Sequence, residues 1–158
     1  MKAEGRRLRN ASLSFWLLLS AFCLFSCASA APLAEPEIHI SQISSLAEAA
    51  AHVSGNISVH YQVDIANHTN VTMTIKRIDV LSLGEGAYTL RPSSNPFDAT
   101  LKPGETTALQ FWAPAFIADP TIIGANGPVS LRVTTQYDTP SGRAQSIVIQ
   151  QVHPLSSL

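Results

Sequence analysis

The sequence predicts an all-β protein, an antiparallel β-sandwich of about seven to eight strands. From residue 35 onward, apolar residues alternate with polar ones in short segments, and turn-forming residues recur about every 8 to 12 residues. Of the 158 residues, 46% are hydrophobic and 13% are charged, with a formal net charge of −1. This length suits one core and is too short for two ordinary domains. The low charge argues against a disordered chain and against a nucleic-acid binder with a basic face.

Residues 1–30 have the pattern of an export signal. A basic segment from Met1 to Asn10 precedes an apolar run from Leu13 to Phe25, and Ala28-Ser-Ala30 supplies the small residues that signal peptidase accepts. An uncleaved membrane anchor is the alternative, but the apolar run of about 13 residues is short of the roughly 20 that span a bilayer. We therefore expect cleavage after Ala30, with residues 31–36 as a tether.

Lipidation is a second alternative for the leader. Leu24-Phe-Ser-Cys27 resembles a bacterial lipobox, in which Cys27 would be lipidated and become the mature N-terminus, although Phe25 is bulkier than the residue usual there. Both cysteines, Cys23 and Cys27, lie in the leader, so a chain cleaved after Ala30 has no thiol. That chain has no disulfide, no thiolate catalysis and no cysteine-ligated metal. Contact with a membrane is expected only through the signal or through a lipid anchor at Cys27.

The near-neutral total hides a basic leader on an acidic body. The leader holds Lys2, Arg6, Arg7 and Arg9 against Glu4, which leaves 10 − 4 = 6 bases and 11 − 1 = 10 acids in the remaining residues, a net charge of −4. Because an acidic body repels phosphate backbones, we expect no nucleic-acid partner.

The body begins with a strand from Glu37 to Ile43 and one short helix over residues 46–53. Ser45-Leu-Ala-Glu48 matches a capping box, and Gly55 ends the helix. The clearest strand follows, with five apolar residues alternating with polar ones: Ile57, Val59, Tyr61, Val63 and Ile65.

After a turn at Asn67-His-Thr-Asn70, the next strand runs from Val71 to Val80. Its apolar register shifts by one residue after Ile75, which predicts a β-bulge near Lys76-Arg77.

The rest of the chain reads as shorter strands joined by turns. Lys102-Pro-Gly-Glu105 has proline before glycine, as a type II turn requires. The sandwich domain is expected over residues 37–154, with 155–158 as a tail. The remaining predicted elements are a short strand at Ala87–Arg91, a loop at Pro92–Pro96, an extended segment at Phe97–Leu101, an inward face at Thr107, Leu109 and Phe111, strands at Val129–Tyr137 and Ala144–Val152, and a hairpin loop at Asp138–Gly142.

Two of these motifs carry a resemblance. The strand ending in Val63-Asp-Ile-Ala-Asn67-His-Thr, together with Leu101-Lys-Pro-Gly-Glu-Thr-Thr-Ala-Leu-Gln-Phe111, resembles bacterial immunoglobulin-like and fibronectin type III-like domains over residues 55–152. The resemblance implies an immunoglobulin-like β-sandwich. Two departures are Thr107 at the position of the tyrosine corner and the absence of an inter-sheet disulfide.

The sequence contains none of the common catalytic motifs. Nucleophile elbow, zinc-protease helix, phosphate loop and dinucleotide fingerprint are all missing, so we expect no enzyme and no cofactor. The alternative is a periplasmic protein that binds a metal or a small ligand, for which His39, His60 and His153 are the candidates.

The segment Ala113–Pro128 reads as a long loop, and loops of that length are often functional. It contains Phe116 and Ile117, and Trp112 beside it falls on the face opposite Phe111, so its ring is expected to point outward. These three residues (Trp112, Phe116 and Ile117) are the candidate site for a protein or peptide partner in the cell envelope. The alternative is that the loop folds back and caps the sandwich, with a short strand at Thr121–Ile123. The expected function is that of an exported, non-enzymatic module, periplasmic or extracellular, that works by protein–protein contact.

Overall fold

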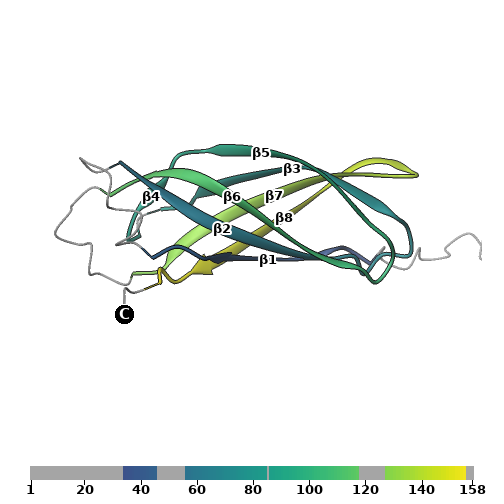
Figure 1. The fold of residues 1–158 in the computed structure, drawn as a ribbon, viewed down its shortest axis with the longest axis horizontal. Coiled ribbons are helices and arrows are strands. Elements are labelled where there is room, and N and C mark those ends of the chain that lie inside the picture. The colour runs from purple at the N-terminus through teal and green to yellow at the C-terminus, as the bar shows by residue number, and fades with distance from the viewer. Residues whose placement is uncertain (1–33, 46–55, 85, 118–126, 156–158) are drawn as a thin grey trace, which may run out of the picture. The chain divides into compact units, whose positions relative to one another are not determined.

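The computed structural model describes residues 34–45, 56–84, 86–117 and 127–155, which all lie in one compact unit, Ala34–Leu158. The predicted signal peptide over 1–30, Cys27 and the predicted helix over 46–53 lie outside the described residues. The described residues form eight strands (Figure 1): β1 Glu37–Gln42, β2 Asn56–Ala66, β3 Met73–Ser82, β4 Thr89–Leu90, β5 Ser93–Leu101, β6 Thr106–Phe116, β7 Val129–Thr139 and β8 Gly142–Val152. Within these ranges, no helix has the length and hydropathy to cross a bilayer.

The strands form two four-stranded sheets, one with the order β1-β2-β6-β4 and the other with the order β5-β3-β7-β8. All neighbouring strands are antiparallel. This confirms the predicted all-β, antiparallel class with two sheets. The chain changes sheet at every connection from β2 through to β7, and only the β1–β2 and β7–β8 connections stay within one sheet.

Strand β2 is central in its sheet and shows the strictest alternation. Every second side chain, from Ile57 to Ile65, is buried in the core, and the side chains between them face outward. Its two neighbours, β1 and β6, bond to opposite edges of it.

The predicted β-bulge in β3 is confirmed. The pairing register shifts between Ile75 and Arg77 against both β5 and β7. The extra residue lets Ile75 and Ile78 both face the core, where each is fully buried.

Two predicted loops are wrong. Ser93 to Pro96 belong to β5 rather than to a loop; β5 is an edge strand, where proline is tolerated. Ala113 to Phe116 belong to β6 and continue its pairing with β2, so the connection to β7 starts only after them. The predicted short strand at 121–123 lies outside the described residues.

The last hairpin is tighter than predicted. Strands β7 and β8 pair without interruption from Val129↔Val152 to Thr139↔Gly142, leaving only Pro140 and Ser141 in the turn.

Candidate protein-binding surface

The candidate surface lies on the outer side of the β1-β2-β6-β4 sheet. Along β6 the side chains of Trp112, Pro114 and Phe116 all point away from the core, while those of Ala113 and Ala115 point into it. Trp112 is 54% exposed and Phe116 is 43% exposed. We call His60, Trp112, Pro114 and Phe116 the Trp112 surface.

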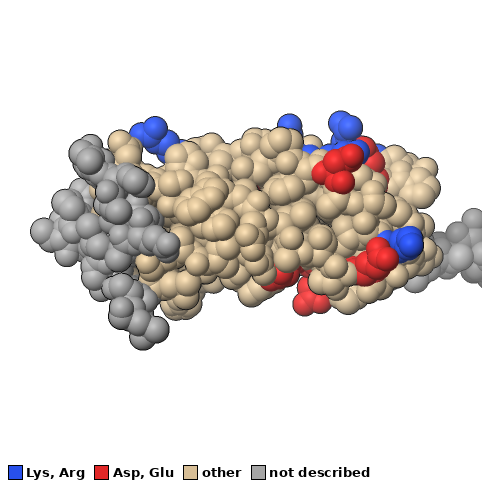
Figure 2. Space-filling model, in the orientation of Figure 1, with Lys and Arg blue, Asp and Glu red and all other residues tan. Residues whose placement is uncertain are grey.

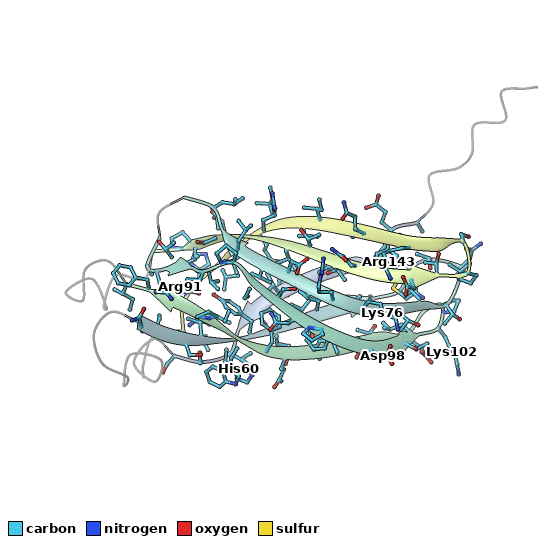
Figure 3. All side chains as sticks on the ribbon, turned by 90° about the horizontal axis from the view of Figure 1, so that it is seen from above. His60, Lys76, Arg91, Asp98, Lys102 and Arg143 are labelled. Atoms are coloured by element: carbon cyan, nitrogen blue, oxygen red, sulfur yellow. The ribbon has the colours of Figure 1, made fainter. Side chains whose placement is uncertain are left out.

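His60 on β2 is directly opposite Trp112 in the register of the two strands. Its imidazole stacks on the indole with a centroid distance of 4.2 Å and an interplanar angle of 10°. Within the described residues, neither ring nitrogen of His60 has a hydrogen-bond partner. Figure 3 shows His60 on the outer side of the sandwich. The stack restricts the indole before any partner arrives, which lowers the entropy cost of binding.

Polar side chains border the Trp112 surface on its Gln110 side. Gln110 Nε2 donates to Gln62 Oε1 (3.0 Å), and Gln62 Nε2 donates to Asp64 Oδ1 (2.9 Å).

At the other end, near Phe116, an Arg91 guanidinium nitrogen (Nη2) donates to Asn56 Oδ1 (3.2 Å). An apolar centre with a polar border is the usual anatomy of a protein interface. In the view of Figure 2, the charged side chains gather toward the margins and one end of the molecule, with a broad uncharged area between them.

A buried polar chain lies beneath this surface. The hydroxyls of Tyr61 and Tyr88 are 2.5 Å apart, and Tyr88 donates to Gln42 Oε1 (2.7 Å). Gln42 Nε2 donates to the backbone carbonyl of Ser44 (2.7 Å). The side-chain hydroxyl of Ser44 in turn accepts a hydrogen bond from the backbone N–H of His60 (2.9 Å). The backbone that carries the stacked imidazole is therefore held by the core.

Burial raises the pKa of both tyrosines. The pKa of Tyr88 rises to about 12. Burial, with the Tyr88 hydroxyl, also raises the pKa of Tyr61. Both hydroxyls are therefore neutral at physiological pH and act only as hydrogen-bonding groups.

The three predicted partner-binding residues do not lie together. Trp112 and Phe116 share the outer face of β6, but Ile117 is only 2% exposed and packs in the core. Ile117 therefore supports the end of the sandwich and is not available to a partner. The sequence suggested His60 only as a candidate for binding a metal or a small ligand. Its stacking on Trp112 was not predicted, because it depends on the pairing of β2 with β6, which are distant in sequence.

The candidate histidines also lie apart. His39 Nδ1 is 3.0 Å from Gln150 Nε2, His60 stacks on Trp112, and His153 is exposed beyond the end of β8. Among the described residues, no group of three or more His, Cys, Asp or Glu side chains has the arrangement of a metal site.

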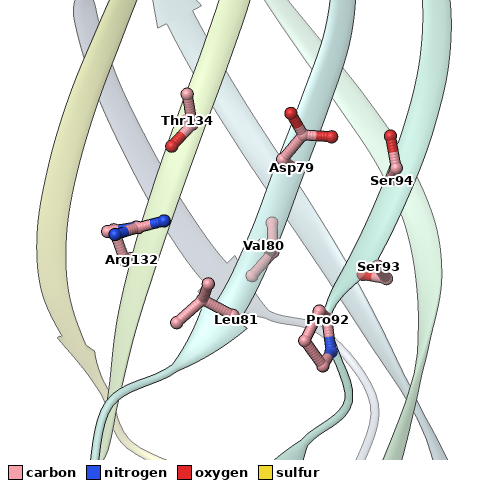
Figure 4. Close-up of a pocket in the computed structure, with 8 residues that line it drawn as sticks. All are labelled: Asp79, Val80, Leu81, Pro92, Ser93, Ser94, Arg132 and Thr134. Carbon is pink, nitrogen blue, oxygen red and sulfur yellow. The ribbon is translucent and has the colours of Figure 1, made fainter.

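A shallow hollow lies on the outside of the other sheet, between β3, β5 and β7 (Figure 4). Asp79, Ser94, Arg132 and Thr134 are among its lining residues, and its volume is about 210 Å³. Ligand pockets usually have volumes of about 300 to 1,000 Å³. Asp79 is already bonded to Arg77 Nε (3.2 Å), so its carboxylate is not free for a ligand.

No protein-family model matches the sequence, and no curated protein matches it. Among solved structures, a protein provisionally identified as a late embryogenesis abundant (LEA) protein is similar, with 19% sequence identity and a TM-score of 0.50 over 94% of this chain and 87% of that chain. A protein from Archaeoglobus fulgidus has 9% identity and a TM-score of 0.45, over 80% and 98% of the two chains. A protein from Bordetella pertussis, provisionally identified as ApaA, has 15% identity and a TM-score of 0.46, over 78% and 94%.

At these identities the likeness to the LEA protein shows the fold alone. None of the three descriptions names an immunoglobulin-like or fibronectin type III-like domain, and membership of that superfamily stays a prediction.

Proposed function

We propose that the protein is a non-enzymatic module of the cell envelope that binds another protein through the Trp112 surface. The observation that carries this proposal is an indole that is more than half exposed and is stacked on His60. Tryptophan is among the residues most enriched at the energetic centres of protein interfaces.

The shape and chemistry of the surface favour a protein over a small ligand. Strands β2 and β6 present an open sheet face there, with aromatic rings and a proline at the centre and amide side chains beside them. Small-ligand sites are concave and enclose most of the ligand. An open face of this composition suits a second surface of similar size.

Export is the second part of the proposal, and it is supported by the leader sequence. The basic start, the apolar run and Ala28-Ser-Ala30 favour cleavage after Ala30, and Cys27 offers lipidation as the alternative. Mass spectrometry of the mature N-terminus separates them: a chain that begins at Ala31 supports cleavage, whereas a diacylglyceryl group on Cys27 supports lipid anchoring. An intact Met1 in the native membrane fraction contradicts both.

The Trp112 surface is tested by photocrosslinking in the native envelope. A photoreactive phenylalanine analogue replaces exposed Pro114, which lies between Trp112 and Phe116 on β6. We expect an adduct of one defined mass that is lost in the Trp112→Ala variant, because removal of a central aromatic costs about 2 kcal/mol or more, roughly a 30-fold loss of affinity.

The matched control carries the same analogue at Thr106, which is exposed at the other end of β6. It should give no such adduct. Trp112→Ala should unfold within about 1 kcal/mol of the parent, because the ring is largely outside the core. The proposal fails if Pro114 gives no adduct, or if the adduct persists in both Trp112→Ala and Phe116→Ala.

A further inference from the structure

The sheets of this sandwich end in four edge strands, β1, β4, β5 and β8. An edge strand presents unpaired backbone N–H and C=O groups that another strand can pair with, and proteins usually protect such edges. Three of the four edges here have an identifiable protection.

On β1, the side-chain amide of Gln150 occupies the free edge: its Oε1 accepts the N–H of Ile40 (3.1 Å), and its Nε2 donates to the C=O of Ile40 (2.9 Å). Strand β4 has only two residues. Strand β5 carries Pro96 and the charged Asp98. Short length, proline and charge are the common protections of edge strands.

Strand β8 has none of these protections. It is eleven residues long, contains no proline, and pairs with β7 without a bulge. Its one charged residue, Arg143, lies at its start. Ile147 is 53% exposed and Ile149 is 66% exposed on its outer face.

The strand pairing indicates which backbone groups of β8 are free. Leu83 follows β3, and its N–H donates to the carbonyl of Ser130 on β7 (2.7 Å). The backbone N–H and C=O of Ser130 therefore point toward β3. The same holds for every second residue of β7, because backbone groups alternate in direction along a strand. Their partners on β8 therefore direct theirs away from β7. These partners include Gln145, Ile147, Ile149 and Gln151.

The free edge is self-complementary in one antiparallel register. With Val148 on the two-fold axis, Ile147 lies opposite Ile149 of a second copy, and Gln145 lies opposite Gln151. In this register, the residues that form hydrogen-bonded pairs between the two copies are the ones whose backbone N–H and C=O groups are not used by β7. The isoleucines of both copies then form one apolar cluster, and no like charges face each other along the paired strands.

We infer that β8 pairs with β8 of a second copy to form a symmetric dimer with one continuous eight-stranded sheet. The pairing is isologous and closed, because each copy uses β8, which alone among the edge strands of the described residues lacks such protection. It lies on the sheet opposite the Trp112 surface and does not depend on the proposed function.

Disulfide trapping tests the register in the full chain, with Cys23 and Cys27 replaced by serine. Hydrogen-bonded pairs have Cα atoms about 5.5 Å apart, within the disulfide range, whereas diagonal neighbours are about 7 to 8 Å apart and outside it. A mixture of Ile147→Cys and Ile149→Cys chains should therefore form covalent dimers under mild oxidation, and either variant alone should not. Arg132→Cys mixed with Thr134→Cys is the matched control, because both positions face outward on the neighbouring, non-edge strand β7.

Sedimentation velocity supplies a second measurement. The parent chain should sediment as a dimer, and Ile149→Lys should shift it to a monomer, as should Ile147→Pro, which removes one free N–H without breaking the pairing with β7. A lysine in place of Ala108, exposed on β6, should leave the dimer intact.

The inference is overturned if the parent chain is monomeric at every concentration measured. This holds even if the edge of β8 then binds an added extended peptide, because the proposed partner is a second copy. It is also overturned if the Ile147→Cys and Ile149→Cys mixture crosslinks no more than the control mixture.

Discussion

The hydroxyl of Tyr88 fixes the direction of the hydrogen bonds in the buried polar chain. Its proton goes to Gln42 Oε1, so the short contact between the two tyrosines must use the proton of Tyr61. Tyr88 therefore both donates and accepts, whereas Tyr61 only donates. Removal of the Tyr88 hydroxyl therefore leaves more hydrogen-bonding groups without a partner than removal of the Tyr61 hydroxyl does.

We predict that Tyr88→Phe destabilises the protein more than Tyr61→Phe. The first change leaves both Gln42 Oε1 and the Tyr61 hydroxyl without a partner, at a cost of about 2 to 3 kcal/mol; the second removes one donor and costs about 1 kcal/mol. Urea unfolding with an unchanged m-value measures both. Equal losses would contradict this hydrogen-bond direction.

The same tyrosines predict an alkaline limit of stability. The pKa of Tyr88 is about 12 in the folded protein, and unfolded tyrosine ionises near pH 10. Above pH 10 the unfolded state therefore loses protons that the folded state keeps, so the free energy of unfolding falls as the pH rises toward 12. Below that range the contribution is fully present.

Denaturant unfolding at pH 8 and pH 11 tests this expectation, together with tyrosinate absorbance. Burial, with Glu35 nearby, also raises the pKa of Tyr137, so no tyrosine of the folded chain should ionise at its ordinary pKa. Titration of Tyr61 or Tyr88 near pH 10 without unfolding would contradict the buried arrangement.

At the scale of elements, Asn67 joins the end of β2 to the turn before β6. Its backbone N–H donates to Glu105 O (2.9 Å), and its carbonyl accepts from Gly104 N (2.8 Å). Its side-chain Nδ2 donates to the carbonyls of Val71 (2.9 Å) and Leu101 (3.2 Å). Gly104 has φ +79°, and Glu105 N bonds to Lys102 O (3.0 Å), which confirms the predicted type II turn.

Asn67→Ala is expected to destabilise the protein by about 3 kcal/mol. The change removes the side-chain donor to the buried carbonyl of Leu101 and one of the two side-chain donors to the carbonyl of Val71, which keeps the Thr69 hydroxyl. It also removes the acceptor of Thr69 N–H (3.0 Å). Asn70→Ala, at an exposed position in the same turn, is the matched control and should change stability by less than about 0.5 kcal/mol. Thermal or urea unfolding distinguishes them, and similar losses would argue against a bracing role for Asn67.

Local patterns predicted those elements whose two faces differ in polarity. The alternation from Ile57 to Ile65 predicted β2, and the shifted register predicted the bulge in β3. The start of β5 was missed because Ser93 to Pro96 has turn-forming residues and no strong apolar face. An edge strand needs fewer apolar residues and tolerates proline, so its local signal is weak.

The candidate site was predicted only in part, because local alternation shows which face a side chain occupies but not what lies beside it. The alternation along β6 predicted that Trp112 points outward, because Phe111 beside it faces the core. The stack with His60 depends on the pairing of β2 with β6, and local periodicity contains no information about that register. The burial of Ile117 follows from the continuation of β6 to Phe116, which the sequence pattern did not indicate.

At the scale of the whole sandwich, Gln150 joins the two sheets. It lies on β8, yet its amide bonds to both backbone groups of Ile40 on β1, in the opposite sheet. The side chain thereby substitutes for a strand along part of the edge of β1. This predicts that β1 depends on a single amide for local protection as well as on its pairing with β2.

Gln150→Met should therefore loosen β1 without unfolding the molecule. Methionine keeps the length and apolar contact but leaves the N–H of Ile40 without its acceptor, and loss of about 1.4 kcal/mol of local protection raises the amide exchange rate about tenfold. Hydrogen exchange should show this increase at Ile40, while amides of β7 remain protected. Gln151→Met, exposed on the same strand, is the matched control and should change neither. If Ile40 exchanges at the same rate in both variants, the sheets are held together at this corner by apolar packing alone, and the edge of β1 needs no side-chain cap.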